Sequence, residues 1–146
     1  MTIRCLTPYT PGHHTRPRND GTSWCGFLVT TRWRAVKATN SVALTFDDGP
    51  DTNFTARVLD ILAEHDVPAA FFVVGHRVRA HPELLVRAHA EGHVIGNHTE
   101  SHSLLFHCRL WSTLRREIVA CNEAIQSTIG IVPTMFRSPH GFKNPA

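Results

Sequence analysis

Residues 41–50 read SVALTFDDGP: an apolar, β-rich run that ends in two carboxylates, a glycine and a proline. The run at residues 41–46 predicts a buried strand, and the Asp-Asp-Gly-Pro that follows it is typical of a turn. From this point on, the sequence alternates regularly between short apolar strands and amphipathic helices. The stretch therefore marks the start of a β/α domain, which is expected over residues 40–146.

The remainder of the domain continues this alternation. The pattern predicts helices at residues 53–65, 81–92 and 110–129, and strands at residues 69–74, 94–95 and 134–136. The longest helix keeps one face apolar, and on that face Cys121 is expected to be a small core residue. Strand–helix alternation is typical of a parallel β/α architecture. About four β/α units predict half of a barrel or a small open sheet.

The composition indicates a globular domain that follows a segment of a different kind. Of the 146 residues, 42% are hydrophobic and 18% are charged, as in a domain with a buried core. Residues 1–39 instead contain prolines, glycines and clustered basic residues without a sustained period, and they are expected to form an irregular basic arm. The basic excess belongs to this arm, so the domain gives no electrostatic argument for nucleic-acid binding. No apolar run reaches membrane-spanning length, and no signal peptide is visible, which leaves the localisation open.

Polar side chains directly follow three of the predicted strands. Asp47 and Asp48 follow the first strand, His98 and His102 the third, and Arg137 the fourth. In parallel β/α folds the carboxyl ends of all strands open on the same face, where active sites collect. Residues that lie far apart in the sequence are therefore expected to meet at one rim.

Each of these clusters also has a plain structural interpretation, as a turn, a pair of surface histidines or a solvated arginine. Two adjacent carboxylates at a strand end nevertheless repel each other unless a cation joins them. His98 and His102 are spaced i, i+4, so on a helical turn they would face the same way and could share a metal ion. One carboxylate and two imidazoles make a three-ligand site with positions left open for water, and the second aspartate is then free to act as a base.

Other metal chemistries fit the sequence less well. The zinc-protease motif needs a glutamate directly after the first histidine, and Thr99 holds that place. The four cysteines form no Cys-x-x-Cys pair, so a thiolate zinc site is not expected. A non-haem iron oxygenase would also use two histidines and one carboxylate, but the adjacent aspartates at a parallel strand end argue against it. The histidines outside the motif are expected to be structural or exposed: His65, His81, His89, His93 and His107.

Three strings in this region resemble the signature motifs of one family. TFDDGP at residues 45–50, HTESH at 98–102 and RSPHG at 137–141 are similar, in order and spacing, to the first three motifs of the polysaccharide deacetylase family. This family is the NodB homology domain of carbohydrate esterase family four. The resemblance implies a distorted β/α barrel, of which this chain would form a truncated part. It also implies a divalent metal ion, which is usually zinc, with cobalt or another divalent ion as an alternative.

The resemblance implies roles for the polar residues at the strand ends. Asp48, His98 and His102 would be the metal ligands, Asp47 the general base, and Arg137 the residue that tethers this base. The implied reaction is hydrolysis, in which a metal-bound water attacks an N- or O-acetyl group. The implied substrate is an acetylated polysaccharide or oligosaccharide of the chitin, peptidoglycan or xylan type.

The resemblance also implies that residues of the third motif lie around the substrate. His140 holds the position whose backbone N–H binds the oxyanion, and Pro139 and Gly141 are expected to contact the substrate. Family members continue into two more motifs, of which one holds an Asp/Trp pair and the other a Leu-x-His that supplies the general acid. Neither has a counterpart before Ala146. The chain is therefore expected to be a fragment or a degenerate copy, and metal or glycan binding without turnover is the alternative function.

Overall fold

A computed structural model describes residues 22–25, 29–32, 42–103 and 110–141. The chain divides into two compact units, residues 1–42 with 144–146, and Ala43–Lys143. In the first unit, β1 (Thr22–Cys25) pairs antiparallel with β2 (Val29–Arg32). The expectation of irregular structure over residues 1–39 is wrong for these two segments. Strands of four residues are too short to show a period in the sequence. The other residues of this arm lie outside the described part of the chain.

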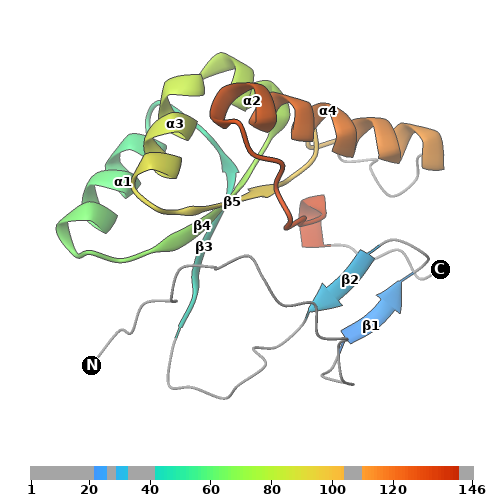
Figure 1. Cartoon of the computed structure of the whole chain (residues 1–146), viewed down its shortest axis with the longest axis horizontal. Coiled ribbons are helices and arrows are strands. Elements are labelled where there is room, and N and C mark those ends of the chain that lie inside the picture. Colours follow the sequence, from blue (N-terminus) through green and yellow to red (C-terminus); the bar gives the residue numbers. More distant parts are fainter. Residues whose placement is uncertain (1–21, 26–28, 33–41, 104–109, 142–146) are drawn as a thin grey trace. The chain divides into compact units, whose positions relative to one another are not determined.

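The second unit is built on a parallel sheet of three strands, in the order β3 (Leu44–Gly49), β4 (Ala69–Val73) and β5 (Val94–Asn97) (Figure 1). This arrangement confirms the predicted parallel β/α architecture. The expected strand at residues 134–136 is reduced to a single parallel bridge between Asn97 and Phe136. The described part of the chain therefore holds three β/α strands and one bridge where four strands were predicted.

Within the residues that the structure describes, four α-helices accompany the sheet: α1 (Thr55–Glu64), α2 (Gly75–Ala80), α3 (Pro82–Ala90) and α4 (Trp111–Ile129). Three of them confirm the predicted helices within a few residues at each end. The sequence did not reveal α2, because a helix of six residues is too short to show a helical period. Gly130 ends α4 with a φ of 76°, in the left-handed conformation expected of a helix C-cap.

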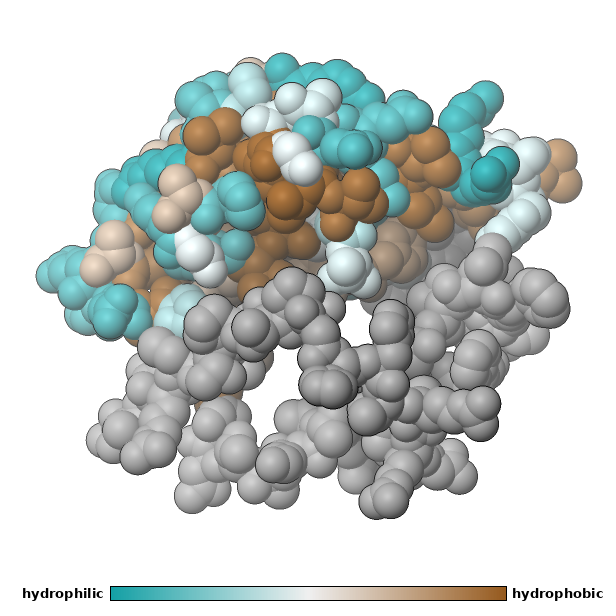
Figure 2. All heavy atoms as spheres, viewed as in Figure 1, coloured by the Kyte–Doolittle hydropathy of each residue, from teal (hydrophilic) through white to brown (hydrophobic). Residues whose placement is uncertain are grey.

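The hydrophobic core lies between the sheet and the helices. Phe71, Val73 and Ile95 from the sheet belong to the same buried cluster as Leu59 of α1 and Ile125 of α4. In Figure 2, polar residues gather over the outer side of the helices, and apolar residues lie beneath them. Burial of each such side chain stabilises the fold by about 1.5–3 kcal/mol relative to an exposed one. The core thus holds the sheet against the helices, and the strand ends that carry the polar motifs are fixed with it.

Cys121 is a core residue, as predicted. It is fully buried on α4, and its thiol donates a hydrogen bond to the carbonyl of Val73 at 3.4 Å. Burial raises the pKa of the Cys121 thiol to about 12, so the thiol stays protonated and unreactive near neutral pH.

Among the described residues, no helix is long and apolar enough to cross a membrane.

Candidate metal centre and catalytic residues

The two aspartates of the first motif lie near the end of β3, and the strand has a bulge at the second of them, Asp48. Asp47 lies opposite Phe72 and Gly49 lies opposite Val73, so Asp48 is skipped in the register. Asp48 has a φ of 68°, a left-handed conformation that costs a non-glycine residue about 1–3 kcal/mol. In a regular strand two neighbours point to opposite faces. The bulge changes this alternation and gives each carboxylate its own partners.

Asp48 lies with the two histidines of the second motif. Its Oδ1 is 3.5 Å from Nε2 of His98 and 3.0 Å from Nε2 of His102. The three candidate ligand atoms all lie within 4.8 Å of one another. A tetrahedral ion with bonds of about 2.0–2.1 Å places its ligand atoms roughly 3.3 Å apart. The triad therefore fits a divalent ion, and three protein ligands leave a coordination position open.

The histidines meet without the helical turn that their spacing predicted. Residues 98–102 form no helix, and both Thr99 (φ 72°) and His102 (φ 48°) are left-handed. His98 Nδ1 lies 2.7 Å from the carbonyl oxygen of Arg137, and because a carbonyl only accepts, Nδ1 carries the proton. The unprotonated Nε2 of His98 then faces Asp48, as a metal ligand requires. The two imidazoles lie together, although the helical turn expected to bring them together is wrong, and their role as metal ligands stays a prediction.

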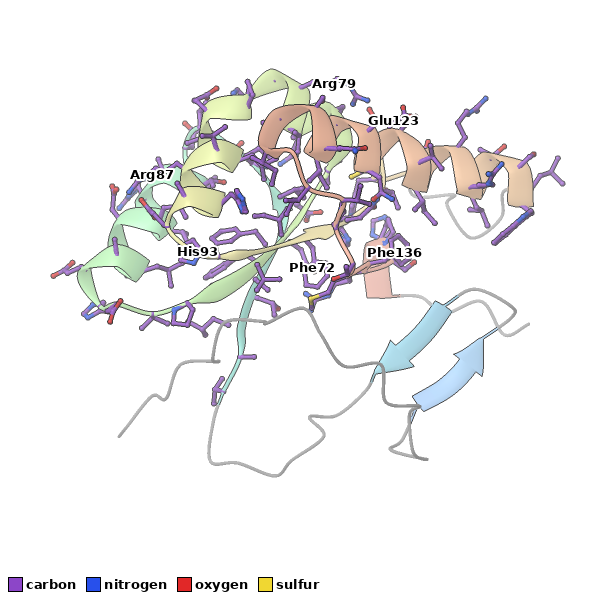
Figure 3. All side chains as sticks on the ribbon, viewed as in Figure 1. Phe72, Arg79, Arg87, His93, Glu123 and Phe136 are labelled. Carbon is purple, nitrogen blue, oxygen red and sulfur yellow. The ribbon has the colours of Figure 1, made fainter. Side chains whose placement is uncertain are left out.

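Arg137 contacts the other aspartate. Its Nη1 donates to Oδ1 of Asp47 at 2.6 Å and to the hydroxyl of Thr45 at 3.0 Å. Its guanidinium carbon lies 4.0 Å from the centre of the Phe72 ring, a cation–π distance. Phe72 lies on the side of the sheet turned away from the helices (Figure 3), and Thr45 and Asp47 share that face because alternate residues of a strand point the same way. Three contacts thus set the orientation of Arg137.

The third motif reaches the triad through a single turn of 3-10 helix, Pro139–Gly141. The His140 ring packs edge-on against the His102 ring, with 4.6 Å between the ring centres and 66° between the planes. His140 has a φ of 59°, and Pro139 before it is buried. His140 therefore lies at the rim of the triad. The oxyanion role of His140 and the substrate contacts of Pro139 and Gly141 stay predictions.

Three supporting residues were not predicted from the sequence. Arg77 of α2 donates from Nη1 to the backbone carbonyl of Asp48 at 2.8 Å, and so braces the bulge. No sequence signal identified it, because α2 itself was missed. Thr45 lies two residues before Asp47, and the period of two along a strand is a signal that would have placed both on one face. Phe72 was expected only as part of a buried strand.

One histidine outside the motifs is buried. His93 is 7% exposed, and its Nδ1 accepts a hydrogen bond from the backbone N–H of Ala69 at 3.3 Å. Burial lowers the pKa of His93 and so favours the neutral imidazole. His65 and His89 are exposed and His81 is partly buried, whereas His107 lies outside the described residues. These placements agree with the structural or exposed roles expected for them.

Comparisons with known proteins agree with this geometry. A family model described as polysaccharide deacetylase matches residues 34–146. The chain is 51% identical over 87 residues to a chitooligosaccharide deacetylase of Rhizobium leguminosarum bv. trifolii, covering 60% of this chain and 40% of that one. It is 43% identical over 100 residues to a peptidoglycan-N-acetylglucosamine deacetylase of Bacillus cereus, covering 68% of this chain and 36% of that one. The chain thus spans about half or less of the length of these relatives.

Solved structures show the same fold. The peptidoglycan deacetylase PdaC from Bacillus subtilis superposes with a TM-score of 0.68 at 39% identity, covering 70% of this chain and 50% of that one. A family 4 acetyl xylan esterase from Clostridium thermocellum, in complex with a cobalt ion, gives a TM-score of 0.63 at 41% identity over the same shares. The family model spans the second unit, including all three motifs. The chain belongs to the polysaccharide deacetylase family.

Proposed function

We propose that this chain carries a metal-dependent hydrolytic centre that removes acetyl groups from a polysaccharide. The observation that carries the proposal is the division of labour between two adjacent carboxylates. Asp48 lies with His98 and His102, whereas Asp47 is bound to Arg137. One carboxylate is thereby available to bind an ion, and its neighbour is available to take a proton. Hydrolysis by an activated water needs both groups side by side.

Each residue then has a definite part in the reaction. Asp48, His98 and His102 would hold a divalent ion, which would supply Lewis-acid chemistry and lower the pKa of water from about 15.7 towards 7. Asp47 accepts the proton of the attacking water, and Arg137 holds the Asp47 carboxylate in the orientation that this transfer requires. The backbone N–H of His140 donates to the oxyanion, and loss of one such donor typically costs about 2.7–4 kcal/mol. The leaving amine must gain a proton, which requires a general acid besides these residues.

Zinc is the ion that this donor set suits best. Two imidazoles and one carboxylate form a known set of ligands for catalytic zinc, with an open position for water. Cobalt is a close alternative, and the related acetyl xylan esterase is in complex with a cobalt ion. The named relatives act on chitooligosaccharides and peptidoglycan. We therefore propose an acetylated polysaccharide or oligosaccharide as the substrate.

The test measures acetate release by the full chain from chitin oligomers, peptidoglycan and acetylxylan, before and after treatment with a chelator. Zn²⁺ should restore the release that the chelator removes. Asp48→Ala should lose both Zn²⁺ binding and acetate release. Asp47→Asn should retain Zn²⁺ binding and lose acetate release. Asp66→Asn is a matched control, since Asp66 is exposed and Asn also tolerates its φ of 50°.

Two results would contradict the assignment of roles. One is tight, stoichiometric Zn²⁺ binding by the Asp48→Ala protein. The other is unchanged acetate release by the Asp47→Asn protein. Zn²⁺ binding by the parent chain without acetate release from any of the three polymers would indicate binding without turnover.

A further inference from the structure

We propose that Glu117 of α4 is a positioning residue, which holds the loop between the two histidine ligands and thereby sets the affinity of the site for its ion. The inference rests on the metal site proposed above. It extends that site to α4, a helix that supplies none of the three candidate ligands. Three sets of contacts among the described residues carry it, together with the burial of Glu117.

The first set joins Glu117 directly to the loop. Ser101 donates to Oε2 of Glu117 from both its backbone N–H and its hydroxyl, each at 2.8 Å. Ser101 immediately precedes the ligand His102. Glu117 is only 8% exposed, so these charge-assisted hydrogen bonds are formed where water competes little. One carboxylate oxygen therefore fixes both the backbone and the side chain of the residue next to a ligand.

The second set joins α4 to the start of the loop. Asn97 precedes His98, and its side-chain nitrogen donates to the carbonyl of Ile118 at 2.9 Å and to Oδ1 of Asn122 at 2.7 Å. The side-chain oxygen of Asn97 accepts the backbone N–H of Thr99 at 2.7 Å. Helix α4 thus holds the residue before each of the two histidines.

The backbone of the loop explains why such anchors are needed. Thr99 and His102 have φ values of 72° and 48°, and non-glycine residues keep this conformation only where the surroundings impose it. Helix α2 supplies two more contacts, from the backbone N–H of Gly75 to the carbonyl of Thr99 at 3.0 Å and from that of His76 to the carbonyl of Glu100 at 3.1 Å. The loop is therefore bound between two helices. Relaxation of either side would move an imidazole away from Asp48.

The burial of Glu117 in α4 supports the same positioning role. Glu117 is buried together with Cys121, Ala124 and Ile125, on a face that is otherwise apolar or small. A carboxylate on such a face requires hydrogen-bond partners, and the loop provides them. Glu123 of the same helix is exposed and carries the same functional group (Figure 3). It provides a matched control for the loss of a carboxylate from α4.

The test is a titration of the metal-free full chain with Co²⁺, which reports both the affinity and, through its visible absorption bands, the geometry of the bound ion. Glu117→Leu, which leaves both Ser101 donors without their acceptor, should bind Co²⁺ 10–100-fold more weakly than the parent, the range found when outer partners of metal ligands are changed. Its absorption bands at saturation should also differ from those of the parent. Glu123→Leu should leave both the affinity and the bands unchanged. Circular dichroism confirms at each step that the protein is folded.

Further variants distinguish the possible failures. Ser101→Ala removes one of the two hydrogen bonds and should weaken Co²⁺ binding by less than Glu117→Leu, which removes both. It takes over the test if Glu117→Leu does not fold. Unchanged affinity and bands in the folded variants would overturn the role of Glu117. Asp48→Ala separates this outcome from a wrong metal site: loss of Co²⁺ binding in Asp48→Ala supports the proposed site, whereas tight binding would overturn both proposals.

Discussion

Gly96 of β5 lies directly opposite Phe72 of β4, and the substitution Gly96→Ala tests how the sheet supports Arg137. A methyl group on Gly96 would lie 2.6 Å from Cδ1 and 2.7 Å from Cε1 of the Phe72 ring, and 3.4 Å from the carbonyl of Met135. Carbon atoms in normal contact are about 3.5–4.0 Å apart, so the ring must shift by roughly 1 Å. Phe72 is buried beneath the guanidinium of Arg137, which limits where the ring can go.

Two opposing terms set the magnitude. Overpacking of a well-packed site typically costs about 1–3 kcal/mol. The replacement of a strand glycine by alanine removes an entropic penalty of roughly 0.5–1 kcal/mol. We therefore expect a net loss of about 1–2 kcal/mol, which for a domain of this size lowers the melting temperature by roughly 5–15 °C. Urea unfolding followed by circular dichroism measures the change.

A double-mutant cycle with Phe72→Leu tests the cause. If the ring is the obstacle, the smaller leucine relieves the clash, and the double variant should be less destabilised than the sum of the single variants by about 1 kcal/mol. Additivity within about 0.5 kcal/mol would refute this reasoning, as would a Gly96→Ala protein as stable as the parent. Gly96→Ala should also lower acetate release while leaving Zn²⁺ affinity unchanged, because Phe72 contacts Arg137 and not the triad.

Two more predictions concern single side chains. Arg137→Lys keeps the charge but loses the planar group that contacts Asp47, Thr45 and Phe72. Because the ion pair of Arg137 and Asp47 is partly exposed, acetate release should fall only about tenfold. Zn²⁺ affinity, measured in a parallel titration, should be unchanged. Burial lowers the pKa of His93 in the folded chain, so on acidification the unfolded chain protonates this histidine before the folded chain does. The free energy of unfolding should therefore fall as the pH drops below about 6.5. In His93→Asn, whose amide oxygen can accept the same N–H, the urea midpoint should fall less between pH 7.5 and 5.5; an equal fall would contradict this assignment.

Most of the architecture could be predicted from periodicity, because long amphipathic helices and buried strands repeat their pattern over many residues. Helix α4 and strands β3 and β4 were predicted in this way. Helix α2 and the hairpin of β1 and β2 were not, since elements of four to six residues do not complete enough periods to be distinguished from loops. Residues 134–136 were predicted as a strand but form only the bridge at Phe136, since three residues are also too few to show a strand period.

The candidate site divides along a similar line. The sequence by itself determined which residues gather at the strand ends, because in a parallel β/α fold every strand carries its carboxyl end to the same rim. Asp47, Asp48, His98, His102 and Arg137 were all predicted on that ground. Their types and order also sufficed for the resemblance to the deacetylase motifs.

Only the tertiary structure decided how each side chain reaches its partner. The bulge at Asp48, the non-helical loop from His98 to His102 and the bonds of Glu117 to Ser101 depend on backbone angles and on contacts between distant segments. No period along the chain encodes such contacts, because they arise when helices pack against the sheet and satisfy the hydrogen bonds of its loops. The resemblance to the family motifs gave the two adjacent aspartates different roles, and the bulge in the folded backbone is the physical reason that they have different neighbours.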